Sequence, residues 1–265
     1  MSKSAKECPE AASGTSPTAR PERDERELHG AWRRFQHHAF PPPAPDLAAY
    51  VDHYWIVSWS YAQPYRQKIV PYPQVHLTIT DDGTAVVTGV SSRHQIRVLD
   101  GDRTVFGVAF RSGCFRPFLD GPVAAITDRQ LPASEIFDGI PAEATIESVE
   151  HMLRARRPTP DPRAEEAADI VAAIAAKPEI TRVDQLVGSR SVRGLQRLFA
   201  DYVGINPKWV IRRYRLHEVT ERLAKGAKID WAGLAAELGY ADQAHFVRDF
   251  TKMFGEPPTH YAQRY

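Results

Sequence analysis

Cysteine is scarce in this sequence: Cys8 and Cys114 are the only two among 265 residues. Two cysteines so far apart provide neither a disulfide framework nor the paired ligands of a structural zinc site. No run of about 18 apolar residues could span a membrane, and the polar N-terminus lacks the apolar stretch of a secretory signal. We therefore expect a soluble, cytoplasmic protein without a membrane partner.

Signatures of catalysis and of cofactor binding are also missing. The sequence contains neither the G-x-S-x-G turn of serine hydrolases nor a G-x-x-x-x-G-K phosphate loop. His37 and His38 are adjacent, which is poor geometry for joint metal chelation, and no cysteine or carboxylate lies nearby at metal-ligand spacing. We assign no catalytic residue, no metal and no cofactor, and we predict that the protein is not an enzyme.

Net charge is close to zero, with 34 Lys and Arg against 33 Asp and Glu, but the charge is unevenly distributed. Residues 1–162 carry 18 basic and 20 acidic side chains, whereas residues 163–265 carry 16 basic and 13 acidic ones. Within the second part, the segment 190–215 holds seven basic residues and one acid, Asp201. Such a local excess indicates an anionic partner, although a solvated helix face would give the same pattern.

Composition changes along the chain predict an α+β protein of two domains. Residues 1–27 are rich in Pro, Ser, Glu and Arg, which is typical of a disordered tail. We expect a β-rich domain over residues 28–157, a Pro-rich linker over 158–163 and an all-α domain over 164–265.

Short strands dominate the first domain between residues 53 and 110. The run QVHLTIT alternates apolar and polar residues, and Asp82-Gly83 is a hairpin signal. Asp100-Gly101 is a second hairpin signal, which pairs Gln95–Leu99 with Thr104–Phe110. Several short strands with regular turns predict a small β-barrel or sandwich-like fold.

Helix start and stop signals follow one another through the second domain. Ser191, Asn206, Asp230 and Asp242 are suited to cap helices, and Gly204 is suited to end one. The helix that begins at Pro207 would run to about residue 224, roughly 27 Å at 1.5 Å per residue.

This helical domain also repeats itself. Each half has a short capped helix, a tight turn and a longer helix that ends in a Gly-x-x-Pro step, GINP at 204–207 and GEPP at 255–258. A short helix, a turn and a longer helix is the helix-turn-helix arrangement. We place the two copies at about residues 181–203 and 230–254, joined by the long linker helix. Two such units could enter adjacent major grooves of DNA.

The segments SVRGLQRLFADYVGINPKWVIRRYRL and LAAELGYADQAHFVRDFTKMFGEPPTHY resemble the two halves of the AraC/XylS-type DNA-binding domain. The resemblance implies a bacterial transcription regulator that binds double-stranded promoter DNA in a sequence-specific way and that acts with RNA polymerase, for instance as an activator. It departs from the family at Gly194, inside the first recognition helix. Carried over by motif position, the residues that face the bases are Arg193, Gln196, Arg197, Gln243, Ala244, Val247 and Arg248. Ser191 and Lys208 take phosphate or capping positions, and Arg248 could contact a base or a phosphate.

The N-terminal part is similar to an uncharacterised domain often joined to AraC-like DNA-binding domains. The resemblance is carried by VPYPQVHLTIT, GVAFRSGCFRPFL and ITDRQLPASEIF. It implies a sensor or dimerisation domain without naming an effector. The strands are rich in aromatic residues that could line a pocket for a small apolar or aromatic ligand. The candidate ligand-binding residues are Trp55, Trp59, His76 and Phe106. The simpler interpretation is that the aromatic residues are core and surface residues of a small β domain and that His76 is a structural histidine.

Two alternatives remain open from the sequence. The N-terminal domain could serve only to form a homodimer, with no effector. Less favoured is a ligand-processing N-terminal domain fused to the DNA-binding domain. Cys114, between Arg111 and Arg116, could be a redox sensor if these arginines lower its pKa, but an inert, half-buried thiol is the simpler interpretation.

Overall fold

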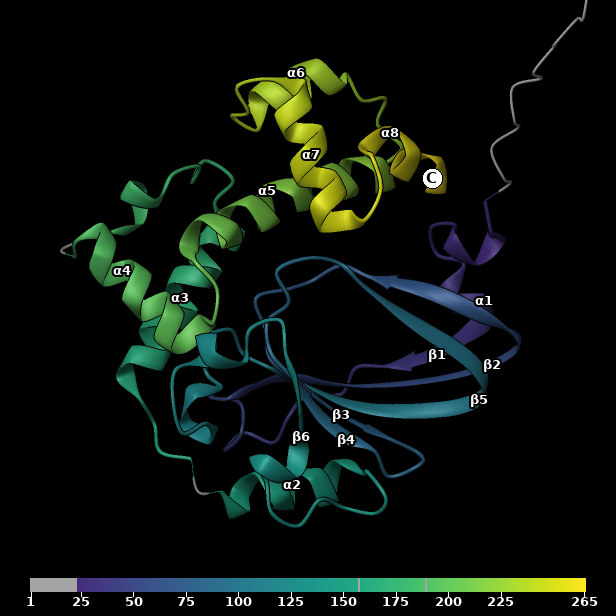
Figure 1. Cartoon of the computed structure of the whole chain (residues 1–265), viewed down its shortest axis with the longest axis vertical. Coiled ribbons are helices and arrows are strands. Elements are labelled where there is room, and N and C mark those ends of the chain that lie inside the picture. Colours follow the sequence, from purple (N-terminus) through teal and green to yellow (C-terminus); the bar gives the residue numbers. More distant parts are fainter. Residues whose placement is uncertain (1–22, 157, 189) are drawn as a thin grey trace, which may run out of the picture.

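The computed structural model describes residues 23–156, 158–188 and 190–265. It consists of a β-sheet domain followed by a helical domain, which confirms the predicted two-domain α+β class (Figure 1). The strands are β1 (Gln36–Ala39), β2 (Val51–Ile69), β3 (His76–Thr80), β4 (Ala85–Thr88), β5 (Gln95–Phe110) and β6 (Gln130–Pro132). The helices are α1 (Trp32–Phe35), α2 (Ile146–Ala155), α3 (Pro162–Ala176), α4 (Val192–Leu198), α5 (Pro207–Ala224), α6 (Trp231–Glu237), α7 (Gln243–Phe254) and α8 (Pro258–Tyr261).

The six strands form one antiparallel sheet in the order β1-β2-β5-β3-β4-β6. Strands β1 and β6 are the two edges and do not pair with each other, so the expected barrel or sandwich is wrong: the sheet is open. Strands β2 and β5 are much longer than the others and form the long ribbon that extends to the right in Figure 1.

The hairpin expected at Asp100-Gly101 is also wrong. Strand β5 runs without interruption from Gln95 to Phe110, and both of its halves pair with β2. At the Asp-Gly step the pairing shifts register, because Tyr61 lies opposite Gly101 whereas Tyr65 lies opposite Leu99. The extra residues are on β2, where residues 62–64 lie opposite Asp100 alone, so β2 carries the bulge and pairing on both sides keeps β5 continuous through the Asp-Gly step.

The two faces of the sheet have different roles. Leu77, Ile79 and Val108 point to one face and are at most 2% exposed, in the main hydrophobic core. His76 and Thr78 alternate with them and point to the opposite face. Each strand therefore divides its side chains between the core and a second, concave surface.

The expected domain limits shift at two places. Residues 1–22 of the expected tail lie outside the described residues, but residues 23–27 are placed: Glu25–Glu27 form a short 3₁₀ helix. At the other boundary, helix α3 already begins at Pro162, and the carboxylate of Asp161 accepts a hydrogen bond from the backbone N–H of Arg163. The Pro-rich stretch is thus partly helix, because proline fits the first turn.

Both Gly-x-x-Pro steps of the repeat lie against the sheet domain. Gly204 and Gly255 have φ of 87° and 79°, in the left-handed region that favours glycine. A Cβ at Gly204 would lie 2.9 Å from Cγ1 of Val123, and one at Gly255 would lie 2.7 Å from Cδ2 of His94. The two glycines therefore end their helices and also allow close approach of the two domains.

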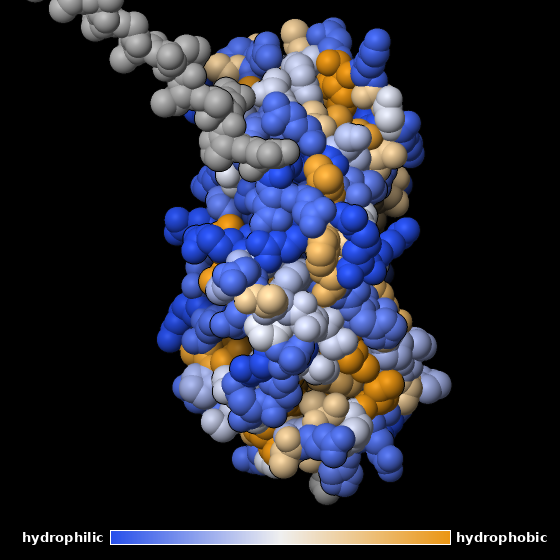
Figure 2. Space-filling model, turned by 90° about the vertical axis from the view of Figure 1, so that its right-hand side faces the viewer, coloured by the Kyte–Doolittle hydropathy of each residue, from blue (hydrophilic) through white to orange (hydrophobic). Residues whose placement is uncertain are grey.

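On the side that carries α1 and the C-terminus, hydrophobic residues form small patches separated by hydrophilic ones (Figure 2). No described helix is both long enough and apolar enough to cross a membrane. Within the described ranges, no three His, Cys, Asp or Glu side chains gather as metal ligands would.

Candidate nucleic-acid interface and sheet cavity

Helix α4 has one buried and one exposed face. The Oγ atom of Ser191 accepts a hydrogen bond of 3.1 Å from the N–H of Gly194, so Ser191 caps the helix as predicted. Leu195 and Leu198 are buried against the core. The three predicted base-facing side chains of this helix are all exposed: Arg193, Gln196 and Arg197.

Helix α7 likewise has one buried and one exposed face. Asp242 caps it through a 2.7 Å bond from the N–H of His245, and Phe246 and Phe250 are fully buried. Gln243, Ala244 and Arg248 are exposed, whereas the predicted contact residue Val247 is half-buried and packs against the core.

The interpretation of the motif missed one side chain on α7. His245 is half-exposed in the first turn, beside Gln243 and Ala244, and its Nε2 lies 3.6 Å from Asp249. The same carboxylate also accepts a 3.0 Å hydrogen bond from Arg212 on α5. Asp249 therefore ties α7 to the linker helix and orients the exposed face of α7.

Not all of the basic segment 190–215 is available to an anionic partner. Arg190 pairs with Glu166, and Arg212 pairs with Asp249. Arg213 is 1% exposed, and the guanidinium of Arg215 lies 5.0 Å from the centroid of the Tyr240 ring. Burial lowers the pKa of both Arg213 and Arg215. Three exposed cations of the segment take part in no ion pair with a described residue: Arg193, Arg197 and Lys208.

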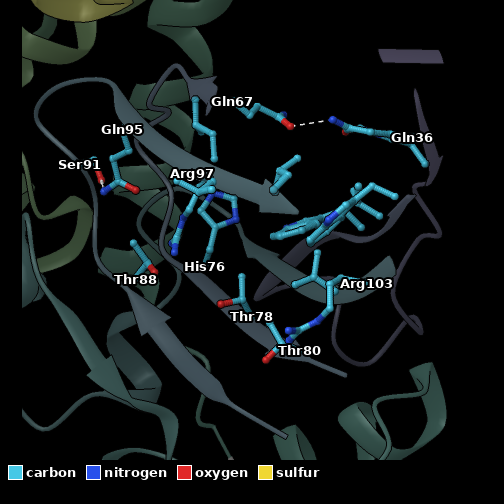
Figure 3. Close-up of a pocket in the computed structure, with 18 of the residues that line it drawn as sticks. Gln36, Gln67, His76, Thr78, Thr80, Thr88, Ser91, Gln95, Arg97 and Arg103 are labelled. Carbon is cyan, nitrogen blue, oxygen red and sulfur yellow. Dashed lines mark hydrogen bonds between the residues drawn. The ribbon is translucent and has the colours of Figure 1, made fainter. Parts of the chain in front are cut away.

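A cavity of about 540 Å³ occupies the concave face of the sheet (Figure 3). Its wall includes Trp55, Trp59 and His76, as predicted, together with Tyr72 and Arg97. Further lining residues are Gln36, His38, Val57, Gln67, Ile69, Val70, Pro71, Gln74, Thr78, Thr80, Thr88, Gly89, Ser91, Gln95, Val98, Leu99, Asp100, Arg103, Thr104 and Val105. A polar bridge connects two of these, where the Gln36 amide donates a 2.8 Å bond to Gln67.

Phe106 was predicted to line this pocket, and that prediction is wrong. Phe106 is 3% exposed and packs in the main core, with its ring centroid 5.6 Å from that of Tyr54. The physical reason is the two-residue period of a strand, which sends Val105 to the cavity and Phe106 to the opposite face.

The floor of the cavity depends on a glycine. Trp55 lies opposite Gly107 in the pairing of β2 with β5. A Cβ at Gly107 would lie 1.9 Å from Cε2 of Trp55, so the indole occupies the space that any other residue there would fill. The Trp55 ring lies beside His76 on the cavity wall, with 6.4 Å between the two ring centroids.

The charged and titratable side chains that line the cavity differ in whether they have an ion-pair or hydrogen-bond partner. Arg103 forms 2.6 Å ion pairs with Asp81 and Asp82. The guanidinium of Arg97 forms no ion pair or hydrogen bond with any other described residue. Burial, with a contribution from the nearby His53, lowers the pKa of His76 to about 4, so its ring is neutral at pH 7. The buried Nδ1 of His76 has no hydrogen-bond partner within the described chain.

Cys114 lies outside both surfaces. It is 1% exposed, and burial raises the pKa of its thiol to about 11, against the opposing effect of Arg111. A thiol of this kind is protonated and shielded from solvent at neutral pH, which favours the inert interpretation over a redox sensor.

Comparisons with known proteins match each domain separately. Residues 39–132 match a family described as a domain of unknown function (DUF6597), and residues 189–264 match a family described as a helix-turn-helix domain. No curated protein matches the chain.

Similar solved structures include two of ToxT from Vibrio cholerae. One shares 10% sequence identity and covers 87% of this chain and 98% of that chain, with a TM-score of 0.38. The other is described as bound to (E)-4-(8-methylnaphthalen-1-yl)but-3-enoic acid; it shares 11% identity, covers 87% and 99% of the two chains, and has a TM-score of 0.39. The transcriptional regulator CdpR from Pseudomonas aeruginosa shares 16% identity over 62% of this chain and 47% of that chain, with a TM-score of 0.33.

The chain therefore carries a helix-turn-helix domain of the AraC type at its C-terminal end, preceded by a domain of the DUF6597 type. The helix-turn-helix is a DNA-binding module, in which the second helix of each unit enters the major groove.

Proposed function

We propose that this protein, which joins an AraC-type helix-turn-helix domain to a sheet domain with a cavity, is a bacterial, cytoplasmic transcription regulator controlled by a small-molecule effector. The observation that carries the proposal is the pair of capped helices, α4 and α7, each with one buried apolar face and one exposed polar face. They lie in a segment that matches a helix-turn-helix family.

The exposed residue types suit the reading of bases. Arginine can make two hydrogen bonds to guanine, and glutamine can make two to adenine. We assign base contacts to Arg193, Gln196 and Arg197 on α4, and to Gln243, Ala244, Val247 and Arg248 on α7, with Val247 offering only its exposed edge. Lys208 is exposed in the first turn of α5, and we assign it a phosphate contact.

The cavity is the proposed effector site. Its volume of about 540 Å³ lies within the range of roughly 300–1,000 Å³ typical of small-molecule pockets. Aromatic rings from Trp55, Trp59 and Tyr72 favour a ligand with an apolar or aromatic body, and polar groups such as His76 would orient it.

The first test is binding of the purified protein to DNA from upstream of its own gene, by fluorescence anisotropy over a series of salt concentrations. We expect specific binding that weakens steeply as salt rises, because counterions are released from the phosphates. Arg193→Ala and Arg248→Ala should each weaken specific binding by about 1–3 kcal/mol. Arg129→Ala, an exposed arginine on the sheet domain, is the matched control and should bind like wild type.

Equal affinity of Arg193→Ala, Arg248→Ala and wild type for the specific site would refute the assignment of α4 and α7 as the helices that read the bases.

A thermal-shift screen of small aromatic compounds tests whether the cavity binds an effector. If no compound stabilises the protein and light scattering shows a homodimer, the effector-independent alternative is favoured. Contact with RNA polymerase belongs to the proposal as well, and stimulation or repression of transcription in vitro would test it. Turnover of a bound compound would overturn the assignment of a non-enzymatic role.

A further inference from the structure

The cavity and the helix-turn-helix domain share a wall. This shared wall consists of two segments of the sheet domain, residues 67–74 and 91–95. Both segments line the cavity, through Gln67, Ile69, Val70, Pro71, Tyr72, Gln74, Ser91 and Gln95. Both also contact the helical domain on their other side, so a ligand and the DNA-binding domain would touch the same stretches of chain.

The strongest of these contacts is made by Arg213 in the middle of the linker helix α5. Its Nε donates a 2.5 Å hydrogen bond to the backbone carbonyl of Pro71, and its guanidinium carbon lies 4.1 Å from the centroid of the Tyr72 ring. The side chain is 1% exposed. Two adjacent residues of the cavity wall thus hold one buried side chain of the helix that connects the two helix-turn-helix units.

Arg213 is an unusual buried cation. No carboxylate within the described residues pairs with it, and its Nη1 has no hydrogen-bond partner there. Within the described residues its positive charge is offset by the Pro71 carbonyl and the face of the Tyr72 ring, with the ring of Phe254 on α7 further away at 5.9 Å. A buried charge with so few partners is sensitive to their position, because losing one exposes the desolvation penalty of the charge.

Three weaker contacts extend the link to the start of the linker helix and to the second helix-turn-helix unit. Lys68 forms a 3.0 Å ion pair with Glu256, which directly follows the glycine that ends α7. Trp209 of α5 donates a 2.9 Å hydrogen bond from its Nε1 to the backbone carbonyl of Ser92. The imidazole of His94 packs against Gly255.

We propose that the shared wall transmits occupancy of the cavity to the DNA-binding domain, with Arg213 as the coupling residue. This regulation rests on the proposed function, because it takes the cavity as the effector site. A ligand that pushes on Pro71 or Tyr72 displaces the partners that the sheet domain supplies to the buried guanidinium. The linker helix then shifts with the wall, or the contact breaks and the helix is released. Either response changes how α4 and α7 are presented to DNA.

The experiment uses the full chain with Thr78→Phe, whose larger side chain fills part of the cavity in place of a ligand. Thr78 points into the cavity from β3 and lies outside the shared wall. This substitution is combined with Arg213→Met, which keeps the bulk and removes the charge. The matched control is Arg222→Met on the same helix, because the partners of Arg222 are Glu218 and Glu237 of the helical domain. If Arg213→Met does not fold, Tyr72→Leu replaces it and removes the ring contact.

Two readouts are taken: hydrogen exchange of the amides in residues 207–216, and the affinity for specific DNA. Thr78→Phe should change both by about fivefold or more in the wild-type and Arg222→Met backgrounds, which is the usual lower range of allosteric coupling. It should change neither in the Arg213→Met background. An equal response in all backgrounds, or no change of exchange in any of them, refutes the coupling. Absence of specific DNA binding in every protein refutes the proposed function instead, and the exchange data still decide the coupling.

Discussion

Gly107→Ala should damage the cavity floor and lower the stability of the protein. The new Cβ would lie 1.9 Å, 2.2 Å and 2.4 Å from Cε2, Cζ2 and Cδ2 of Trp55. Carbon atoms in contact prefer about 3.5–4.0 Å, so the indole ring must move by more than 1 Å. Gly107 lies within a regular strand and its φ is not positive, so alanine adopts this backbone without strain. The whole penalty therefore comes from Trp55.

Overpacking of this kind costs about 1–3 kcal/mol. The assay is urea unfolding followed by circular dichroism, for Gly107→Ala alone and in a Trp55→Leu background. Trp55→Leu removes the atoms that clash, so the cost of Gly107→Ala should fall below about 0.5 kcal/mol there, the usual size of a substitution without such a clash. The same cost in both backgrounds would show that Trp55 does not lie over Gly107, and an unfolding midpoint equal to wild type for Gly107→Ala would refute the reasoning altogether.

Three further predictions follow from single residues. Gly194→Ala should stabilise α4 by about 1 kcal/mol, because alanine is the better helix former and its Cβ would meet nothing closer than 3.5 Å; a lower thermal midpoint would contradict this. Glu256 is buried, which raises its pKa, but hydrogen bonds from Arg23, Arg264 and Lys68 outweigh burial and hold the pKa at about 2. Its folded pKa is below the ordinary value of 4.5, so its stabilisation is present above pH 4.5 and is lost as pH falls towards 2. Between pH 6 and pH 3 wild type should lose more stability than Glu256→Gln, by about 2 kcal/mol, and parallel urea midpoints at the two pH values would count against this. In a Cys8→Ser variant, iodoacetamide should leave native Cys114 unmodified at pH 7.5 and should label it in urea; rapid labelling of the folded protein would show that the thiol is accessible.

The helical domain was predictable because its signals are local. Ser191, Asn206 and Asp242 each accept a hydrogen bond from an N–H three residues later. Such bonds need no distant partner, so the residue type at the cap and the apolar spacing behind it predict the helix. The exposed faces of α4 and α7 follow from the same periodicity.

The sheet domain was less predictable because strand pairing joins residues far apart in the sequence. An Asp-Gly step predicts a hairpin when its neighbours pair with each other. Here the neighbours of Asp100-Gly101 both pair with β2, and the step lies within one long strand, opposite a bulge of β2. Aromatic composition marked the strands as candidates for a pocket, but only the register of β5 decided that Phe106 points away from the cavity.

The sequence by itself determined the capped helices, their repeat and the side chains on their exposed faces, since each depends on residues within a turn or two. Only the tertiary structure decided the open sheet, the cavity and the role of Arg213. A count of charges places Arg213 in a basic segment that faces an anionic partner, yet this side chain is buried against Pro71 and Tyr72, 142 and 141 residues away. Burial of a charge depends on which distant segments pack around it, and local sequence does not carry that information.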